Sequence, residues 1–169
     1  SLPNEWRTVV MRLYHGSDME IVAVDLSCSL VNKDFGKGFY LSDDAKQAWN
    51  FARYKADKPR SISKTAVVTE FIFDEIHLVD GSLRVCRFDG YSLNWVKFIK
   101  ANRQSRNQDY DIVIGPIAND DVRTQFVKHM LGEITESELM ESLKWKRCTY
   151  QYCFISDEAV SFLNIVGKL

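Results

Sequence analysis

The chain has 169 residues, a length typical of one domain, so we treat residues 1–169 as a single domain. It has 46% hydrophobic and 27% charged residues, and 22 basic against 23 acidic residues give a net charge of −1. This balance argues against general electrostatic binding to nucleic acid or an anionic membrane, although a local basic patch remains compatible with it. No apolar run approaches the ~20 residues of a membrane helix, so no membrane partner is predicted.

The cysteines and histidines do not have the spacing of a metal site. The four cysteines, Cys28, Cys86, Cys148 and Cys153, form no CxxC pair, and the chain has only three histidines. We therefore predict no metal and expect free thiols in a reducing cytoplasm. The first residues, "SLPNEWRTVV", lack the layout of a secretory signal, in agreement with a cytoplasmic location.

The expected elements mix strands and helices. The first part of the chain is expected to form a strand over 8–16, a mainly connecting segment over 17–38 with a short strand after its glycines, a helix over 42–56 and a strand over 64–74. The second part is expected to form a helix over 91–103, a strand over 110–116, helices over 120–131 and 135–145, a strand over 148–156 and a last helix over 157–166. The order lacks a regular βαβ repeat, so the predicted class is α+β.

Several local features support these boundaries. Ser42 and Ser156 are expected to cap the helices that follow them. Thr135 precedes Glu138 by three residues, the pattern of a capping box. In the helix over 91–103, Leu93, Val96 and Ile99 are expected to face inward.

Three separated segments carry candidate site residues near strand ends, where scaffolds often present functional groups. They are "LYHGS" with His15, "GKGFYLS" with Tyr40, and "TYQYCFIS" with Gln151. An imidazole, an unshielded glycine backbone and a hydroxyl can hold a planar carboxamide and a ribose hydroxyl. The loop "DFGKGFYLS" adds two glycines and an aromatic face for stacking on a flat heterocycle.

These motifs resemble those of the NAD-cleaving ADP-ribosyltransferases, in the branch with a His–Tyr–Glu triad that includes poly(ADP-ribose) polymerases and diphtheria-toxin-like enzymes. The ordered set "YHGS", "DFGKGFY", "YDIVIGP" and "QYCF" is also similar to a bacterial family of single-domain proteins, the DUF3990 type. The resemblance covers most of the chain. It implies an ADP-ribosyltransferase-like split β-sheet core with flanking helices.

The resemblance also implies roles for individual residues. His15 would bond the adenosine ribose of NAD, and Gly16 would hold the nicotinamide carboxamide through its backbone, with Ser17 supporting that loop. Tyr40 would stack on the nicotinamide ring, and Phe51, eleven positions later, would cover the other side of the ring.

The chain departs from this pattern at two positions. Ala48 stands where the polymerases have a serine that bonds the carboxamide, and Gln151 stands where the triad has its glutamate. A carboxylate stabilises the oxocarbenium-like cation that forms during NAD cleavage, whereas an amide brings no charge. A loss of roughly 1–3 kcal/mol would slow this step about tenfold to a hundredfold. Transfer of one ADP-ribose is therefore favoured over polymer synthesis.

The implied function is that of an NAD-dependent mono-ADP-ribosyltransferase, with NAD as co-substrate and a protein or nucleic acid as acceptor. Two alternatives stay open: an NAD glycohydrolase, with water as acceptor, and a catalytically weak or inactive module that binds NAD or ADP-ribose. Analogy with compact bacterial transferases adds the hypothesis of a toxin with an antitoxin partner.

Each site residue also has a purely structural interpretation. His15 could be a satisfied strand-end histidine, Tyr40 and Phe51 could be packing residues, and Gln151 could be an edge residue facing water. Asp157 or Glu158 could supply the missing carboxylate, although a position in the first turn of a helix already explains them.

Other polar residues leave two interpretations open. Asp111, Asn119 and Asp120 could line the acceptor side, but capping the next helix and holding the turn after Pro116 is favoured. The basic run over 100–106, with Lys97, could be a solvated helix end or could bind the NAD pyrophosphate or a nucleic acid. Lys37 is a further expected neighbour of the ligand.

Overall fold

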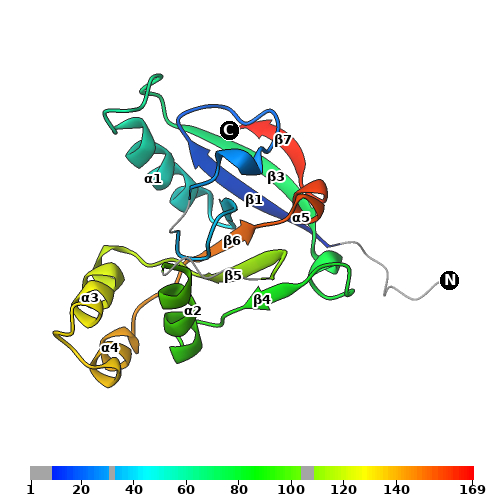
Figure 1. The fold of residues 1–169 in the computed structure, drawn as a ribbon. Helices are drawn as coiled ribbons and strands as arrows, with labels where there is room; N and C mark the ends of the chain where they lie inside the picture. Colours follow the sequence, from blue (N-terminus) through cyan, green and yellow to red (C-terminus); the bar gives the residue numbers. More distant parts are fainter. Residues whose placement is uncertain (1–8, 31–32, 104–108) are drawn as a thin grey trace.

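The computed structural model describes residues 9–30, 33–103 and 109–169. In these residues the chain forms one seven-stranded sheet and five α-helices (Figure 1). This confirms the α+β class predicted from the order of elements.

The strands are β1 (Val10–Ser17), β2 (Phe39–Ser42), β3 (Val67–Asp74), β4 (Val85–Arg87), β5 (Ile112–Pro116), β6 (Tyr150–Phe154) and β7 (Asn164–Lys168). The α-helices are α1 (Ala45–Ala56), α2 (Leu93–Arg103), α3 (Asp120–Met130), α4 (Glu136–Leu143) and α5 (Asp157–Ser161). Two short 3-10 turns are η2 (Leu26–Cys28) and η3 (Glu75–Leu78).

The strand order is β4-β5-β6-β2-β1-β3-β7. Neighbouring strands are antiparallel, except that β4 and β5 are parallel. The first strand of the described chain, β1, therefore lies inside the sheet, between β2 and β3. The last strand, β7, pairs with the outer edge of β3.

The register places the candidate site residues on the sheet. Tyr14 is opposite Ser42, Ser42 is opposite Gln151, and Gln151 is opposite Gly115. Side chains of directly opposed residues point to the same face, and so do residues two apart in one strand. Tyr40 therefore shares a face with Gln151.

Two separate groups of helices cover this face. Over β1 and β3, α1 packs through Ala48 and Ala52 against Val68. Over β5 and β6, α2, α3 and α4 form a larger cluster around Trp95, with Val113 and Cys153 from the strands. The strands that carry Tyr40 and Gln151, β2 and β6, lie between β1 and β5 in the sheet, and Figure 1 shows β6 between α1 and the group of α2, α3 and α4. The opposite face buries a third apolar cluster, with Leu13, Phe71, Phe154 and Ala159 among its members.

The helix caps were predicted correctly in two of three cases. Thr135 and Glu138 form the reciprocal capping box at α4, and Ser156 caps α5. Ser42 is not a cap: it ends β2, and Asp44 caps α1 by accepting from the Lys46 N–H. The Ser42 hydroxyl instead accepts from the N–H of Asp44, the residue that directly precedes the helix.

Other expectations were wrong in detail. The last helix ends at Ser161, and 164–168 forms β7, because this β-branched segment completes the edge of β3. Leu93, expected to face inward, is 36% exposed, whereas Trp95, Val96 and Ile99 are buried. The short strand β4 was not predicted.

The packing of α1 on β1 requires a glycine at position 16. A Cβ on Gly16 would lie 2.1 Å from the Ala48 carbonyl oxygen and 2.9 Å from the Ala52 nitrogen. Both are backbone atoms of α1, so the helix itself would have to move.

We therefore expect Gly16→Ala to lower the free energy of unfolding by about 3 kcal/mol, at the upper end for overpacking. Urea denaturation would measure this loss. Gly132→Ala is the matched control, because its added Cβ has open space and only the positive φ of 77° opposes it, at about 1 kcal/mol. Equal losses in the two variants would contradict the packing argument.

Candidate functional site

The sheet opens between β1 and β2. In the described strands these two pair at Tyr14 and Ser42, and the same register would next bring Gly16 opposite Tyr40. At this point the His15 side chain contacts β2 instead: its Nδ1 lies 2.7 Å from the Tyr40 carbonyl oxygen. A side-chain hydrogen bond thus takes the place of the backbone ladder.

The backbone of Gly16 faces this opening. The Leu169 N–H donates to the Val68 carbonyl at 2.9 Å, so the Val68 backbone groups point toward β7. In an antiparallel ladder successive residues alternate in direction. Thr69 therefore bonds its register partner His15, and Gly16 turns its N–H and C=O toward β2.

His15 is buried and neutral. It is 8% exposed, and its ring stacks on Phe39 with centroids 4.2 Å apart. Burial lowers its pKa from 6.5 to about 4; the bond to Tyr40 opposes this, and Lys55 and Lys33 add to it. Because a carbonyl only accepts, Nδ1 carries the proton and Nε2 keeps a free lone pair.

Tyr40 holds the glycine loop through its hydroxyl, which donates to the Gly36 carbonyl at 2.6 Å and accepts from the Phe35 N–H at 3.0 Å. Gly36 has a φ of 88°, a conformation that favours glycine. Burial raises the pKa of the Tyr40 phenol above its ordinary value. The hydroxyl thus has a structural role, and only the ring face remains for a ligand.

Two aromatic rings and two lysines meet beside the opening. The Lys33 Nζ lies 5.8 Å from the centroid of the Tyr40 ring and 5.5 Å from that of Phe51. The Lys55 Nζ lies 5.2 Å from the Phe51 centroid. Phe51 is half-buried and belongs to none of the three apolar clusters, so the interpretation as a core residue is not favoured. The rings of Tyr40 and Phe51 both contact one ammonium group.

Both lysines are partly desolvated. Burial lowers the pKa of Lys33, and the positive charges of Lys58 and Arg60 lower it further, while Asp34 opposes them. Burial also lowers the pKa of Lys55, with Lys33 as the next cause. Holding two like charges close together and out of water is unfavourable. Groups with such perturbed pKa values are frequently found in ligand sites.

Gln151 carries an unsatisfied amide. Its Nε2 is buried and has no hydrogen-bond partner in the described part of the chain. A buried unpaired donor costs about 1–3 kcal/mol, so such a group is a candidate donor to a ligand. Gln151 is thus not a water-facing edge residue.

The remaining residues around β1 and α1 have structural contacts. The buried Ser17 hydroxyl donates to the Asp18 carboxylate at 3.4 Å, and that carboxylate accepts from Ser61 at 2.7 Å, which ties β1 to the loop after α1. Ala48 is buried in the cluster under Gly16.

The polar residues near β5 and α3 are largely structural. The Asp111 carboxylate accepts from the Arg84 N–H at 2.7 Å, and Asn119 caps α3 by accepting from the Val122 N–H. Asp120 is exposed in the first turn of α3. These contacts favour the capping interpretation over an acceptor site.

The other candidates are not among the residues that meet at the opening. Asp157 and Glu158 are exposed in the first turn of α5, which packs on the opposite face of the sheet. Lys37 is exposed and lines a groove of about 390 Å³ with Leu26, Ser27, Ser29 and Ile155. Lys97 is exposed on α2, and the part of the basic run over 104–106 lies outside the described residues.

Lys33 and Lys55 were missed by the sequence interpretation. Lys55 follows Phe51 by four residues on α1, so the two share a helix face and could have been found. Lys33 lies in the segment expected to be mostly connecting, where no periodicity gives a side-chain direction.

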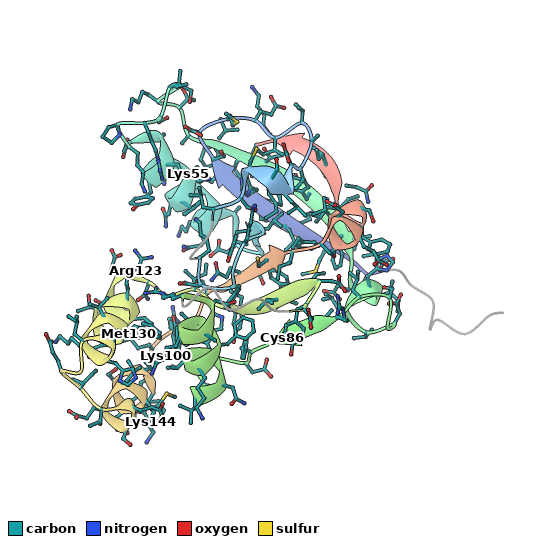
Figure 2. The ribbon with its side chains drawn as sticks, viewed as in Figure 1. Lys55, Cys86, Lys100, Arg123, Met130 and Lys144 are labelled. Carbon is teal, nitrogen blue, oxygen red and sulfur yellow. The ribbon has the colours of Figure 1, made fainter. Side chains whose placement is uncertain are left out.

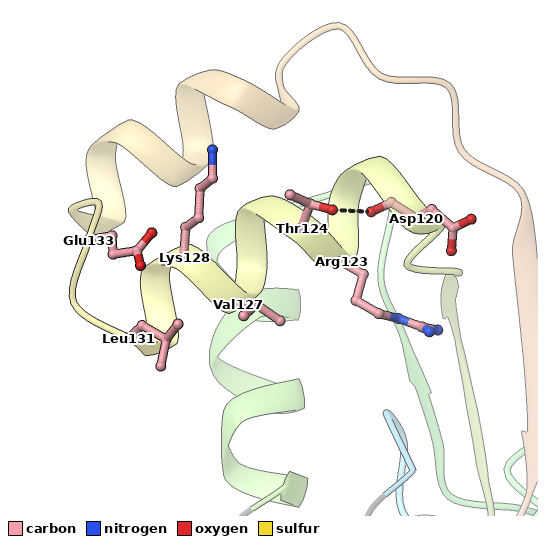
Figure 3. Close-up of a pocket in the computed structure, with 7 residues that line it drawn as sticks. All are labelled: Asp120, Arg123, Thr124, Val127, Lys128, Leu131 and Glu133. Atoms are coloured by element: carbon pink, nitrogen blue, oxygen red, sulfur yellow. Dashed lines mark hydrogen bonds between the residues drawn. The ribbon is translucent and has the colours of Figure 1, made fainter.

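A second groove, of about 480 Å³, runs along α3 (Figure 3). Asp120, Arg123, Thr124, Val127, Lys128, Leu131 and Glu133 line it. It does not include the residues at the opening of the sheet.

These features define an α+β protein with an open backbone edge and two aromatic rings between two helical layers, and with a buried histidine that bonds across the gap between β1 and β2. The chain belongs to the DUF3990 family, described as a protein of unknown function, whose model matches residues 11–165. This match confirms the DUF3990 resemblance read from the motifs. A search of curated proteins gives no match.

Two further properties concern the described residues alone. None of their helices is both long and apolar enough to span a bilayer. All four cysteines are unpaired, and no group of three or more His, Cys, Asp or Glu side chains in 9–30, 33–103 and 109–169 could hold a metal.

The buried His15 predicts an acid-sensitive fold. Its pKa is about 4 when folded and near 6.5 when unfolded, so the unfolded chain binds the proton first. The stabilisation by neutral His15 is fully present above pH 6.5 and falls as the pH approaches 4. Between pH 7 and 4.5 the loss should be roughly 2–3 kcal/mol.

Urea denaturation of the wild type and His15→Gln across this range isolates the effect, because other groups titrate in both proteins. We expect the stability difference between them to shrink by that amount at low pH. A difference that stays constant would contradict burial of a neutral His15.

Proposed function

We propose that this protein is an NAD-dependent mono-ADP-ribosyltransferase with an ADP-ribosyltransferase-like split-sheet core. The observation that carries the proposal is the opening of the sheet at Gly16 and Tyr40, bridged by the His15–Tyr40 hydrogen bond. The motifs "LYHGS" and "DFGKGFYLS" meet at this one point although 16 residues, 18–33, separate them in the sequence.

The nicotinamide carboxamide matches the backbone of Gly16. Its oxygen can accept from the Gly16 N–H, and its amide can donate to the Gly16 carbonyl, both of which face the opening. The nicotinamide ring of NAD is a cation, and the rings of Tyr40 and Phe51 already contact the Lys33 ammonium. In the complex the nicotinamide takes the place of this ammonium between the rings.

His15 and Gln151 suit the two riboses of NAD. The unprotonated Nε2 of His15 can accept a hydrogen bond from a hydroxyl of the adenosine ribose. The Gln151 amide, buried and unpaired on the same face as Tyr40, can bond the 2′-hydroxyl of the other ribose, which carries the nicotinamide, and orient that sugar.

The reaction breaks the bond between the ribose C1′ and the nicotinamide nitrogen. Nicotinamide leaves with the bonding electron pair, and the acceptor's nucleophile forms a bond to C1′ and gives up its proton. The positive charge on the ribose meets a neutral amide at Gln151 rather than a carboxylate, so we expect slow turnover. The same lack of charge leaves an incoming ribose hydroxyl unactivated, which favours transfer of a single ADP-ribose.

A second candidate function is an NAD- or ADP-ribose-binding module without turnover. Gln151 at the triad's third position favours it. Glu70, a buried carboxylate on the same face of the sheet, lies on β3, three strands from β6, and is paired with Arg12. Water as acceptor would give an NAD glycohydrolase by the same bond cleavage. A cytoplasmic location, and a toxin role with an antitoxin partner, remain hypotheses attached to this proposal.

Gln151→Glu tests the proposal by restoring the charge. We expect the release of nicotinamide from NAD to rise about tenfold to a hundredfold, corresponding to roughly 1–3 kcal/mol of transition-state stabilisation. Release of nicotinamide from radiolabelled NAD, with and without cell lysate, measures the rate. Gln125→Glu on α3 is the matched control and should not change it.

Thermal unfolding with NAD separates the two candidates. Both predict stabilisation, about 2.7 kcal/mol at 100 times the dissociation constant, which Phe51→Ala should reduce. The module predicts this stabilisation with no nicotinamide release in either the wild type or Gln151→Glu. No stabilisation and no release in either protein would overturn both candidates.

A further inference from the structure

Basic residues gather at the end of α1 next to the opening of the sheet. Lys55, Lys58 and Arg60 lie there, with Lys33 at the inner side, and the positive charges of Lys58 and Arg60 act on both Lys33 and Lys55. The whole chain has a net charge of −1, so this is a local concentration of positive charge. Such a concentration favours an anionic ligand.

A further basic residue comes from the other helical layer. The guanidinium of Arg123, on α3, acts electrostatically on the phenol of Tyr54 on α1, together with Lys58 and Arg60. Figure 2 shows Lys55 on α1 and Arg123 on the facing end of α3. Figure 3 shows Arg123 extending on the opposite side of α3 from Lys128. The positive charge therefore continues from α1 to α3.

Nearby acidic groups do not neutralise this charge. Asp18 and Asp34 act on Lys55 and Lys33, but Asp18 accepts from Ser61, and Asp34 is paired with Arg103. Asp57 and Asp120 are exposed. Within the described residues, none of the lysines and arginines of this group forms an ion pair: Lys33, Lys55, Lys58, Arg60 and Arg123.

Aromatic rings alternate with these charges. Tyr54 is 56% exposed, and the Lys58 Nζ lies 4.3 Å from its ring centroid. The rings of Phe51 and Tyr54 are 6.4 Å apart and inclined by 30°. Phe51 faces the candidate NAD site. Tyr54 lies about one helical turn further along α1, where its ring contacts the Lys58 ammonium and its phenol is acted on by the charge of Arg123.

Single-stranded nucleic acid has the chemistry that this surface matches. Proteins bind it by combining a row of positive charges, which follows the phosphates, with aromatic faces on which bases stack. An acidic peptide would use the charges but not the exposed ring. A dinucleotide carries a single diphosphate, fewer charges than the side chains gathered here.

We propose that Tyr54, Lys58 and Arg60 on the α1 side, with Arg123 on α3, bind single-stranded nucleic acid; we name these four residues the basic strip. Binding at the basic strip does not depend on catalysis. Its consequence, that the bound strand is the acceptor of ADP-ribose, rests on the proposed function. The strand would lie beside the Phe51 ring, next to the position of the reacting ribose.

Fluorescence anisotropy with labelled 12-residue DNA and RNA strands tests the proposal on the full chain. We expect binding at low salt that weakens tenfold or more in Lys58→Glu/Arg60→Glu and in Arg123→Glu. Two lost phosphate contacts should flatten the slope of log affinity against log salt by about 1.4. Tyr54→Ala should weaken binding while leaving that slope unchanged.

Lys46→Glu is the matched control, because Lys46 is exposed in the first turn of α1 and lies eight residues, or ~12 Å along the helix axis, from Tyr54. Equal weakening by Lys46→Glu would show a general charge effect and overturn the basic strip. The same holds if no strand binds at low salt, or if poly-glutamate of equal length binds as tightly and Tyr54→Ala has no effect.

A parallel measurement of ADP-ribose binding to the same variants separates this proposal from the proposed function. Unchanged ADP-ribose affinity in the strip variants, with weakened strand binding, supports a site distinct from that of NAD. Weakened ADP-ribose binding without any strand binding would assign these charges to the dinucleotide and overturn the proposal. Strand binding without binding of ADP-ribose or NAD would support the basic strip and contradict the transferase.

Discussion

The hydrogen bond from the His15 ring to the Tyr40 carbonyl determines the geometry of the site. It occupies a backbone acceptor that the antiparallel ladder would otherwise use, and so β1 and β2 stop pairing after Tyr14 and Ser42. The Gly16 N–H and C=O are then left facing a space between two strands in the middle of a sheet. The same bond fixes the protonated nitrogen of a buried, neutral imidazole, which leaves its other nitrogen as an acceptor.

The rest of the fold supports this opening from both sides. The absence of a side chain at Gly16 lets α1 pack directly on β1, which brings Phe51 and Lys55 to the edge of the opening. On the other side, the Tyr40 hydroxyl fixes the glycine loop, and the α2–α4 layer packs on β5 and β6. This arrangement includes unfavourable groups: two partly desolvated lysines, and a buried amide nitrogen without a partner in the described part of the chain. Unfavourable groups of this kind, gathered beside one gap, are typical of a binding site rather than of a core.

The sequence predicted the fold class and most elements, because glycines, caps and apolar periodicity are local signals. His15, Gly16, Tyr40 and Phe51 were selected from the resemblance; in the structure His15 contacts Tyr40, and Lys33 contacts the rings of both Tyr40 and Phe51. It failed where a segment's state depends on a distant partner. Residues 164–166 continue the helical spacing of 157–161, yet the free edge of β3 draws them into a strand. Lys33 illustrates the same limit: its place between Tyr40 and Phe51 depends on how three segments meet, which no local pattern encodes. The structural role of the Tyr40 hydroxyl and the unpaired Gln151 amide likewise required coordinates.

The central claim is that the opening at Gly16 and Tyr40 receives a nicotinamide carboxamide. Titration of the ¹⁵N-labelled protein with nicotinamide or benzamide, followed by amide chemical shifts, tests it without depending on catalysis. We expect the largest shifts at the Gly16 and Tyr40 amides, with smaller ones at Phe51 and Gln151. Saturable shifts confined to the groove along α3 or to the groove beside η2, with the Gly16 amide unchanged, would contradict it.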